Sequence, residues 1–171
     1  TFFLTVIFDL VVAIEFGLVL AAILFIKRMS DVSSIRGWTY EGDDDFEEND
    51  PMHIALKTVP VGTLVYEIDG PMFFGVADNF LNISVKDDTK VLILRMRSVP
   101  AIDITAMNAM ENLYNKCKKD GITLILSHVN EQPMRVMQKS GFYDKVGKDN
   151  FCKNIYAAID RAENLLKESL N

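Results

Sequence analysis

The sequence contains few of the side chains that build metal sites and disulfide frameworks. Its 171 residues include two cysteines and two histidines. Cys117 and Cys152 are isolated, each inside a predicted helix, with no Cys-x-x-Cys motif or paired histidines at metal-ligand spacing. We therefore expect no metal site and interpret both cysteines as buried free thiols. His53 and His128 are far apart in the sequence and are interpreted as surface residues.

Catalytic signatures are also missing from the sequence. Asp69, Asp78 and Asp103 are carboxylates that a cleft could bring together. However, no nucleophile–base pair and no Gly-rich phosphate loop accompanies them. We predict that the chain is not an enzyme, and we expect no cofactor.

The chain has no basic excess in its larger part. The formal net charge of −6 arises entirely between residues 29 and 60, where eight acidic residues face two basic ones. Residues 61–171 contain fourteen residues of each sign and sum to zero. Nucleic-acid binding domains are typically basic, so this balance argues against a nucleic-acid partner.

Residues 1–28 are almost entirely apolar and are predicted to be the end of a transmembrane region. A secretory signal carries its positive charge before the apolar run, whereas here Lys27-Arg28 follows it. A break at Asp9 leaves a last span of about residues 10–26, roughly 25 Å long as a helix. A buried helix of a soluble protein is the weaker alternative. The basic pair predicts that the following domain is cytoplasmic, and the absence of an initial methionine suggests a fragment.

Glu15 indicates that this span is not a lone anchor. A carboxylate inside a membrane costs several kcal/mol unless it faces protein or water. We therefore expect the helix to pack into a larger bundle, which the small residues Gly17, Ala21 and Ala22 would permit.

Residues 29–53 are predicted to be an acidic flexible linker. The run Asp43-Asp44-Asp45-Phe46-Glu47-Glu48 repels itself and favours extended chain. A Ca²⁺-binding loop is a more specific alternative, but the glycine and the closing bidentate glutamate that such a loop requires are missing.

Residues 54–171 alternate between strand and helix patterns, which predicts an α/β domain with a mainly parallel or mixed sheet covered by helices. The expected strands are residues 62–68, 72–74, 91–96 and 122–126, and the expected helices are residues 76–82, 105–119, 133–140 and about 150–167. Asn130 is the expected cap of the third helix and Gly141 its stop.

The stretch from Val91 to Met110 is the centre of this domain. An apolar strand breaks at Val99-Pro100 and leads into a helix near Asp103 and Thr105. A helix N-terminus presents unpaired N–H groups and a partial positive charge. Asp103 and Thr105 therefore either cap the helix or take part in a regulatory switch.

Two separate segments resemble one family of membrane proteins. Residues 8–17 with Lys27-Arg28-Met29 resemble the end of the membrane region of SulP-type anion transporters. Residues 66–77, 91–97, 121–127 and 150–152 resemble the C-terminal STAS domain of the same transporters. The order of the two segments is more specific than either segment alone, and together they cover nearly the whole chain.

This resemblance implies the C-terminal tail of an inner-membrane secondary transporter for sulfate or another small anion. It implies a homodimer in which the STAS domain, residues 54–171, regulates transport and contacts the transporter's own membrane domain. Acyl carrier protein and nucleotides are further family-level partners. A membrane-anchored phosphoswitch protein, similar to anti-sigma-factor antagonists, is the alternative function.

The resemblance also suggests a role for the centre of the domain. Anti-sigma-factor antagonists carry Asp-Ser-Ser-Gly-Leu, with the second serine phosphorylated, where this chain has Asp103-Ile104-Thr105-Ala106-Met107. Thr105 occupies the phospho-acceptor place beside Asp103, although the other three positions depart from the pattern. Helix capping remains the simpler interpretation of Thr105. For Met107 and Met110, core packing is the default and a partner contact the alternative.

Overall fold

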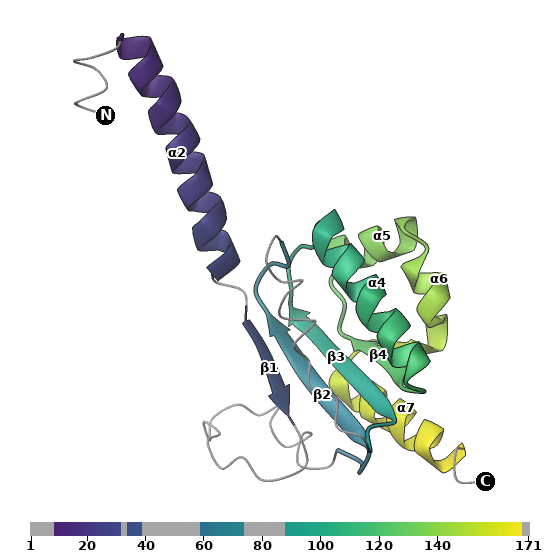
Figure 1. Ribbon diagram of the computed structural model, residues 1–171. Helices are drawn as coiled ribbons and strands as arrows, with labels where there is room; N and C mark the ends of the chain where they lie inside the picture. The colour runs from purple at the N-terminus through teal and green to yellow at the C-terminus, as the bar shows by residue number, and fades with distance from the viewer. Residues whose placement is uncertain (1–8, 32–33, 39–58, 74–87, 169–171) are drawn as a thin grey trace.

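The computed structural model describes residues 9–31, 34–38, 59–73 and 88–168. Within these residues a long helix, α2 (Leu10–Asp31), precedes an α/β domain built on a five-stranded sheet (Figure 1). The strands are β1 (Ser34–Trp38), β2 (Thr63–Asp69), β3 (Val91–Ser98), β4 (Thr123–Ser127) and β5 (Phe151–Cys152). The helices of the domain are α4 (Ile104–Lys119), α5 (Glu131–Lys139), α6 (Phe142–Val146) and α7 (Ile155–Glu168), with a 3-10 turn at Lys148–Asn150.

The sheet is parallel except at one edge. Its order is β1-β2-β3-β4-β5, with β1 antiparallel to β2 and every other pair parallel. Parallel neighbours need a crossover connection, which α4 supplies between β3 and β4, and α5 and α6 supply between β4 and β5. The prediction of a mainly parallel or mixed sheet covered by helices is confirmed.

Helices cover both faces of the sheet, so the central strand β3 is apolar on both sides. Leu92, Leu94 and Met96 lie in the larger part of the core with α4, whereas Val91 and Ile93 lie in the smaller part with α7. Figure 1 shows α4, α5 and α6 on one side of the sheet and α7 on the other. The burial of both faces explains the unbroken apolar run of residues 91–94 at the start of β3.

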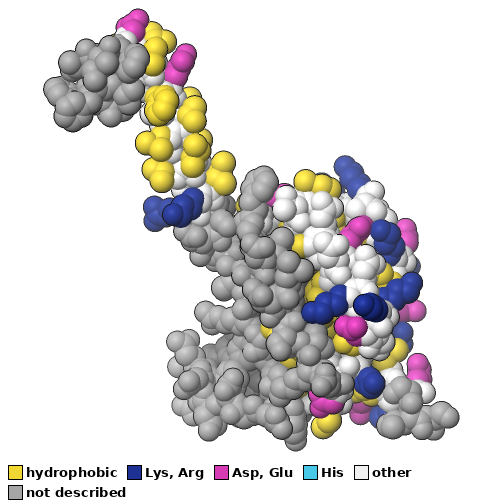
Figure 2. Space-filling model, in the orientation of Figure 1, with side chains coloured by type: hydrophobic (Ala, Val, Ile, Leu, Met, Phe, Trp, Pro, Cys, Tyr) yellow, Lys and Arg dark blue, Asp and Glu magenta, His cyan; other side chains and the backbone are white. Residues whose placement is uncertain are grey.

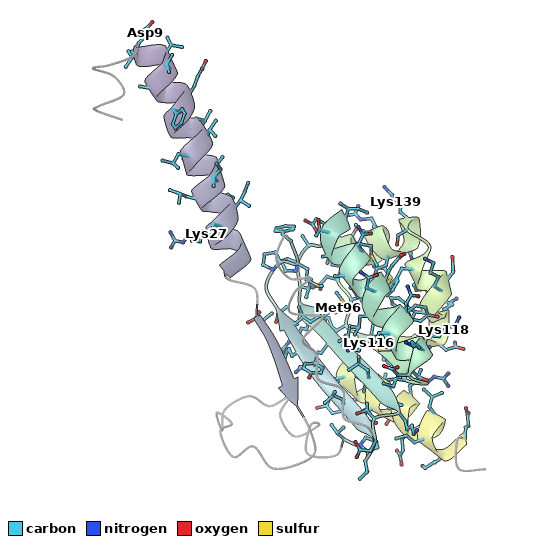
Figure 3. The ribbon with its side chains drawn as sticks, in the orientation of Figure 1. Asp9, Lys27, Met96, Lys116, Lys118 and Lys139 are labelled. Atoms are coloured by element: carbon cyan, nitrogen blue, oxygen red, sulfur yellow. The ribbon has the colours of Figure 1, made fainter. Side chains whose placement is uncertain are left out.

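Helix α4 has an N-cap residue, one buried apolar face and basic residues in its last turn. Asp103 is its N-cap, and its buried face consists of Ala106, Met107, Ala109, Met110, Leu113 and Cys117. Lys116, Lys118 and Lys119 occupy the last turn, where cations interact favourably with the helix dipole. Figure 3 shows Lys116 and Lys118 at the end of α4 farthest from α2.

Helix α2 projects away from the domain with its apolar side chains exposed (Figures 1 and 2). Residues Leu10–Arg28 are long and apolar enough to cross a membrane, and at 1.5 Å per residue they extend about 28 Å. The Asp9 carboxylate accepts a hydrogen bond from the Leu10 N–H at the start of the helix. Lys27 lies toward the other end of the helix, nearer the domain (Figure 3), and Arg28 follows it in the sequence.

Three parts of the predicted secondary structure are wrong. Ser34–Trp38 lies within the predicted linker 29–53 but forms β1, because its backbone pairs with β2. Cys152 lies in the short strand β5 rather than in a helix, because residues 151–152 extend the sheet beside β4. Helix α7 consequently begins at Ile155 instead of near residue 150.

Several other predictions concern residues outside the described part of the chain. The expected helix at 76–82, the acidic run at 43–48, Phe74, Asp78 and His53 are among them. Of the expected strand at 72–74, Met72 forms an isolated parallel bridge with Ile102.

Leu94→Ala should lower the free energy of unfolding by about 2–5 kcal/mol, because truncating a buried leucine removes apolar contacts and leaves a cavity. Val61→Ala is the matched control, since Val61 is 75% exposed and should shift stability by about 0.5 kcal/mol or less. Urea denaturation followed by circular dichroism measures both. Equal losses in the two variants would contradict the placement of β3 in the core.

Candidate functional site

The candidate site is the junction between β3 and α4, residues 99–105. Asp103 has extended backbone and its Oδ1 accepts a hydrogen bond of 2.8 Å from the Ala106 N–H. The carbonyl of Asp103 accepts the first helical hydrogen bond, from the Met107 N–H at 3.0 Å. The Asp103 side chain therefore satisfies the Ala106 N–H, one of the groups that the start of a helix leaves unpaired.

The segment that follows β2 holds the junction from one side. The Gly70 N–H donates to the Ser98 carbonyl, and the Met72 N–H donates to the Ala101 carbonyl at 2.9 Å. The Asp103 N–H in turn donates to the Met72 carbonyl at 3.1 Å. Gly70 has a φ of +87°, a conformation that favours glycine and turns the chain toward the junction.

Two side-chain amides hold the junction from the other side. Asn130 Nδ2 donates to the Val99 carbonyl at 2.7 Å and to the Arg97 carbonyl at 3.0 Å. The Gln132 amide accepts from the Ile102 N–H at 2.9 Å and donates to the Ile102 carbonyl at 3.1 Å. These contacts link residues about thirty positions apart, so the sequence pattern could not reveal them.

Asn130 is at the expected N-cap position of α5, but its side chain makes no capping hydrogen bond. Its amide nitrogen instead donates hydrogen bonds to carbonyls at the end of β3 and in the β3–α4 junction. The site therefore joins three parts of the fold: the end of β2, the β3–α4 junction and the start of α5.

Thr105 is the second residue of α4 and is half-buried. The sequence predicted that Asp103 or Thr105 could cap the helix, and in the structure Asp103 is the cap. Ile104, between them, is 69% exposed although it is apolar. The junction thus presents a hydrophobic side chain and a threonine at the N-terminal end of α4.

Met107 and Met110 are not accessible to a partner in this structure. Both side chains are buried in the core between α4 and the sheet, together with Met72. The default interpretation of core packing therefore fits Met107 and Met110. A partner that approaches this end of α4 meets Ile104 instead.

The junction lies at the edge of the sheet nearest to α2. The first residue of β1, Ser34, pairs with the last residue of β2, Asp69, and three Cα steps after Asp31 can span at most about 11 Å. The carboxyl ends of β2, β3 and β4 all lie along this edge because the three strands are parallel. We call it the carboxyl edge.

The described residues show no arrangement of an enzyme site. Asp69 is exposed and Asp103 caps α4, and no group of three metal-ligating side chains comes together among the described residues. Cys117 is buried, and its burial, more than the nearby Asp120, raises the pKa of its thiol to about 11. Cys152 is only partly buried, and desolvation raises the pKa of its thiol as well.

The chain matches a known domain family and known proteins. Residues 55–162 match the family model described as the STAS domain. YvdB of Bacillus subtilis, named as a candidate sulfate transporter, is 33% identical over 154 residues, 88% of this chain. The bicarbonate transporter BicA of Picosynechococcus is 28% identical over 161 residues, 93% of this chain. The chain spans 27% and 28% of the length of these two relatives.

Solved structures share the fold. A crystal structure titled as a sulfate transporter family protein from Wolinella succinogenes is 37% identical, with a TM-score of 0.65, and covers 70% of this chain and 99% of its own. The murine anion transporter Slc26a9 in an inward-facing state has a TM-score of 0.65 and covers 95% of this chain and 27% of its own. At 16% identity the second likeness concerns the fold alone.

Asp103→Ala should lower the free energy of unfolding by about 1 kcal/mol, because α4 loses its capping carboxylate. Asp103→Asn is the control, since it retains an oxygen that accepts from the Ala106 N–H. Thr105→Ala should leave stability within about 0.5 kcal/mol of the unmodified chain. Thermal unfolding measures all three variants. A larger loss for Thr105→Ala than for Asp103→Ala would show that Thr105 provides the cap.

Cys117 should be unreactive toward thiol reagents at pH 8. A pKa of about 11 leaves about one thiolate in a thousand at that pH, and the thiolate is the reactive form. Labelling with 5,5′-dithiobis(2-nitrobenzoate) at pH 8 should therefore modify Cys117 only after denaturation, because the folded chain buries the thiol. Cys152→Ser isolates the Cys117 signal. Rapid labelling of that folded variant at pH 8 would contradict the burial of Cys117.

Proposed function

This chain belongs to the STAS domain family, and we propose that it is the C-terminal part of a SulP-type secondary transporter for sulfate or another small anion. In this proposal α2 is the last membrane span and the α/β domain is the STAS domain that regulates transport. The parent protein is a multi-pass protein of the plasma membrane, and the STAS domain is cytoplasmic. The chain itself performs no catalysis.

The observation that carries this proposal is the direct connection between the apolar helix and the sheet. Two residues separate α2 from β1, and β1 belongs to the same sheet as β2, β3 and β4. The chain that leaves α2 thus enters the sheet at the carboxyl edge, where Ser34 pairs with Asp69. This geometry suits a domain that moves with the membrane region, and the transporter names of YvdB and BicA support it.

The charges at the end of α2 support a cytoplasmic STAS domain. Lys27 and Arg28 are the last residues of the candidate span, and they adjoin the domain. Basic residues flanking a membrane span favour the cytoplasmic side. Asp9 lies at the opposite end of the helix (Figure 3).

We assign the regulatory contact to the carboxyl edge, where the β3–α4 junction lies. Because α2 connects at this edge, it is the part of the domain nearest to the membrane region. Ile104 is the exposed apolar side chain at the start of α4, and its contact with the transporter's membrane domain would remove it from water. Such a contact would also lie next to Asp103 and Thr105, the neighbours of Ile104 in the sequence.

A second form of regulation that we propose at the same place is phosphorylation of Thr105. A phosphate there would gain from the helix N-terminal field but would lie close to the Asp103 carboxylate. We propose a homodimeric parent, and acyl carrier protein or a nucleotide as further partners, on family resemblance alone.

The alternative is a membrane-anchored phosphoswitch protein similar to the anti-sigma-factor antagonists. It fits less well, because the relatives are named as transporters and because Ile104, Ala106 and Met107 depart from the phosphorylation motif. The sequence upstream in the parent gene separates the two functions: a series of preceding membrane spans supports transport, and their absence supports the phosphoswitch.

Ile104→Arg in the full-length parent should reduce anion uptake by whole cells by about fivefold or more, which corresponds to about 1 kcal/mol of coupling. The reason is that a charge at the start of α4 disrupts an apolar contact with the membrane domain. Val61→Arg is the matched control, because Val61 is equally exposed and apolar but lies before β2, at the opposite edge. Uptake that is unchanged in Ile104→Arg, or reduced equally in both variants, would refute the contact.

The switch at Thr105 has its own test in the same uptake assay. Thr105→Ala and Thr105→Glu should change regulation in opposite directions if the residue is phosphorylated. A Thr105→Ala transporter with unchanged uptake and regulation would leave the contact at Ile104 standing and remove the switch.

A further inference from the structure

The chain just before α4 is hydrogen-bonded on two sides. On one side, the Met72 N–H donates to the Ala101 carbonyl at 2.9 Å, and the Asp103 N–H donates to the Met72 carbonyl at 3.1 Å. On the other side, the Ile102 N–H donates to Gln132 Oε1 at 2.9 Å, and Gln132 Nε2 donates to the Ile102 carbonyl at 3.1 Å. The Gln132 amide therefore occupies the place that a neighbouring strand would take beside Ile102.

Of these two sides, the one formed by Gln132 depends on a side chain. Met72 contributes backbone groups, which remain in place whatever side chain follows them. The two bonds to Ile102 both come from a single amide, which a half-buried glutamine carries at the end of its side chain. Because Ile102 is buried, removing this amide would leave its N–H and its carbonyl without their partners.

Gln132 belongs to a helix whose first residues hold the junction. Two residues of α5 are buried, Pro133 and Met137. Asn130, at the N-cap position, donates its amide N–H to the Val99 carbonyl at 2.7 Å and makes no capping hydrogen bond. A capping side chain would instead satisfy an N–H of the first turn of α5. The start of α5 therefore stabilises the β3–α4 junction rather than its own first turn.

Ile104, the proposed contact with the membrane domain, lies two residues after Ile102. Ile102 is 3% exposed and Ile104 is 69% exposed, so the chain passes from the core to the surface within these two steps. Two Cα steps span at most about 7 Å. The position in which Ile102 is held therefore limits where Ile104 can lie.

We propose that Gln132 is a positioning residue for the contact at Ile104. Its amide holds Ile102 on the side away from Met72, so that Ile104 is presented to the membrane domain in one position rather than several. A contact surface that is already ordered loses less conformational entropy when it binds. This inference rests on the proposed function, since it concerns the same contact, and it adds α5 to the elements on which that contact depends.

The test is a double-mutant cycle in anion uptake by whole cells that express the full-length parent. Gln132→Met removes the amide but keeps the length of the side chain. It should reduce uptake about threefold, as expected if Ile104 then occupies the binding position about a third of the time. In an Ile104→Arg background the same substitution should cause no further reduction, because the contact is already lost. Gln138→Met is the matched control, since Gln138 is an exposed residue of the same helix, and it should leave uptake unchanged in both backgrounds.

A second measurement does not depend on transport. In the 171-residue chain with Cys152→Ser, in detergent micelles, spin labels at Ile104→Cys and Val61→Cys report the distance between the start of α4 and the opposite edge of the sheet. Gln132→Met should broaden the distance distribution measured by pulsed electron paramagnetic resonance, whereas Gln138→Met should leave it unchanged. Gln132→Glu retains an oxygen that can accept from the Ile102 N–H, so its distribution should have an intermediate width.

Three results would overturn the positioning role. The first is unchanged uptake in Gln132→Met while Ile104→Arg reduces uptake, which would leave the contact standing without Gln132. The second is an equal loss from Gln132→Met in both backgrounds, which would show a general effect on the fold. The third is a distance distribution that Gln132→Met does not change. If Ile104→Arg itself leaves uptake unchanged, the contact with the membrane domain is refuted, and the positioning role is refuted with it even if the distribution broadens.

Discussion

The backbone pairing of β1 with β2 determines which end of the sheet lies next to α2. Ser34 pairs with Asp69 and Trp38 with Val65, so the chain that leaves α2 enters the sheet at the carboxyl ends of the parallel strands. If β1 ran parallel to β2, the chain that leaves α2 would enter the sheet at the amino ends of the parallel strands instead. The position of the candidate site relative to α2 therefore depends on the antiparallel pairing of five residues of β1 with five residues of β2.

The same edge contains the β3–α4 junction, residues 99–105. The β3–α4 junction is held by backbone hydrogen bonds from Gly70 and Met72 and by the amides of Asn130 and Gln132. A force applied at Ile104 would thus reach β2 and α5 as well as α4. This connectivity gives a physical route by which a membrane domain and a STAS domain can influence one another, without chemistry in the STAS domain itself.

The sequence predicted those helices and strands whose pattern of apolar residues repeats over several helical turns or several strand residues. The strand expected at 91–96 and the helix expected at 105–119 were both predicted close to their observed bounds, β3 (Val91–Ser98) and α4 (Ile104–Lys119). β1 escaped prediction because backbone pairing with β2, rather than its own side-chain pattern, makes it a strand. β5 and α6 have two and five residues, too few for a period. The sequence named Asp103 and Thr105 but could not choose the cap, and Asn130 and Gln132 reach the site only through contacts distant in sequence.

The central claim is that the carboxyl edge faces the membrane, and the proximity of labels to lipid headgroups tests it most directly. Ile104→Cys and Val61→Cys place a spin label at two exposed positions on opposite edges, about 20 Å apart along β2. The full-length parent, with Cys152→Ser, would be reconstituted in vesicles that contain a paramagnetic headgroup lipid. The account predicts strong relaxation enhancement of the label at position 104 and little at position 61. Equal enhancement at both positions, or stronger enhancement at position 61, would contradict it.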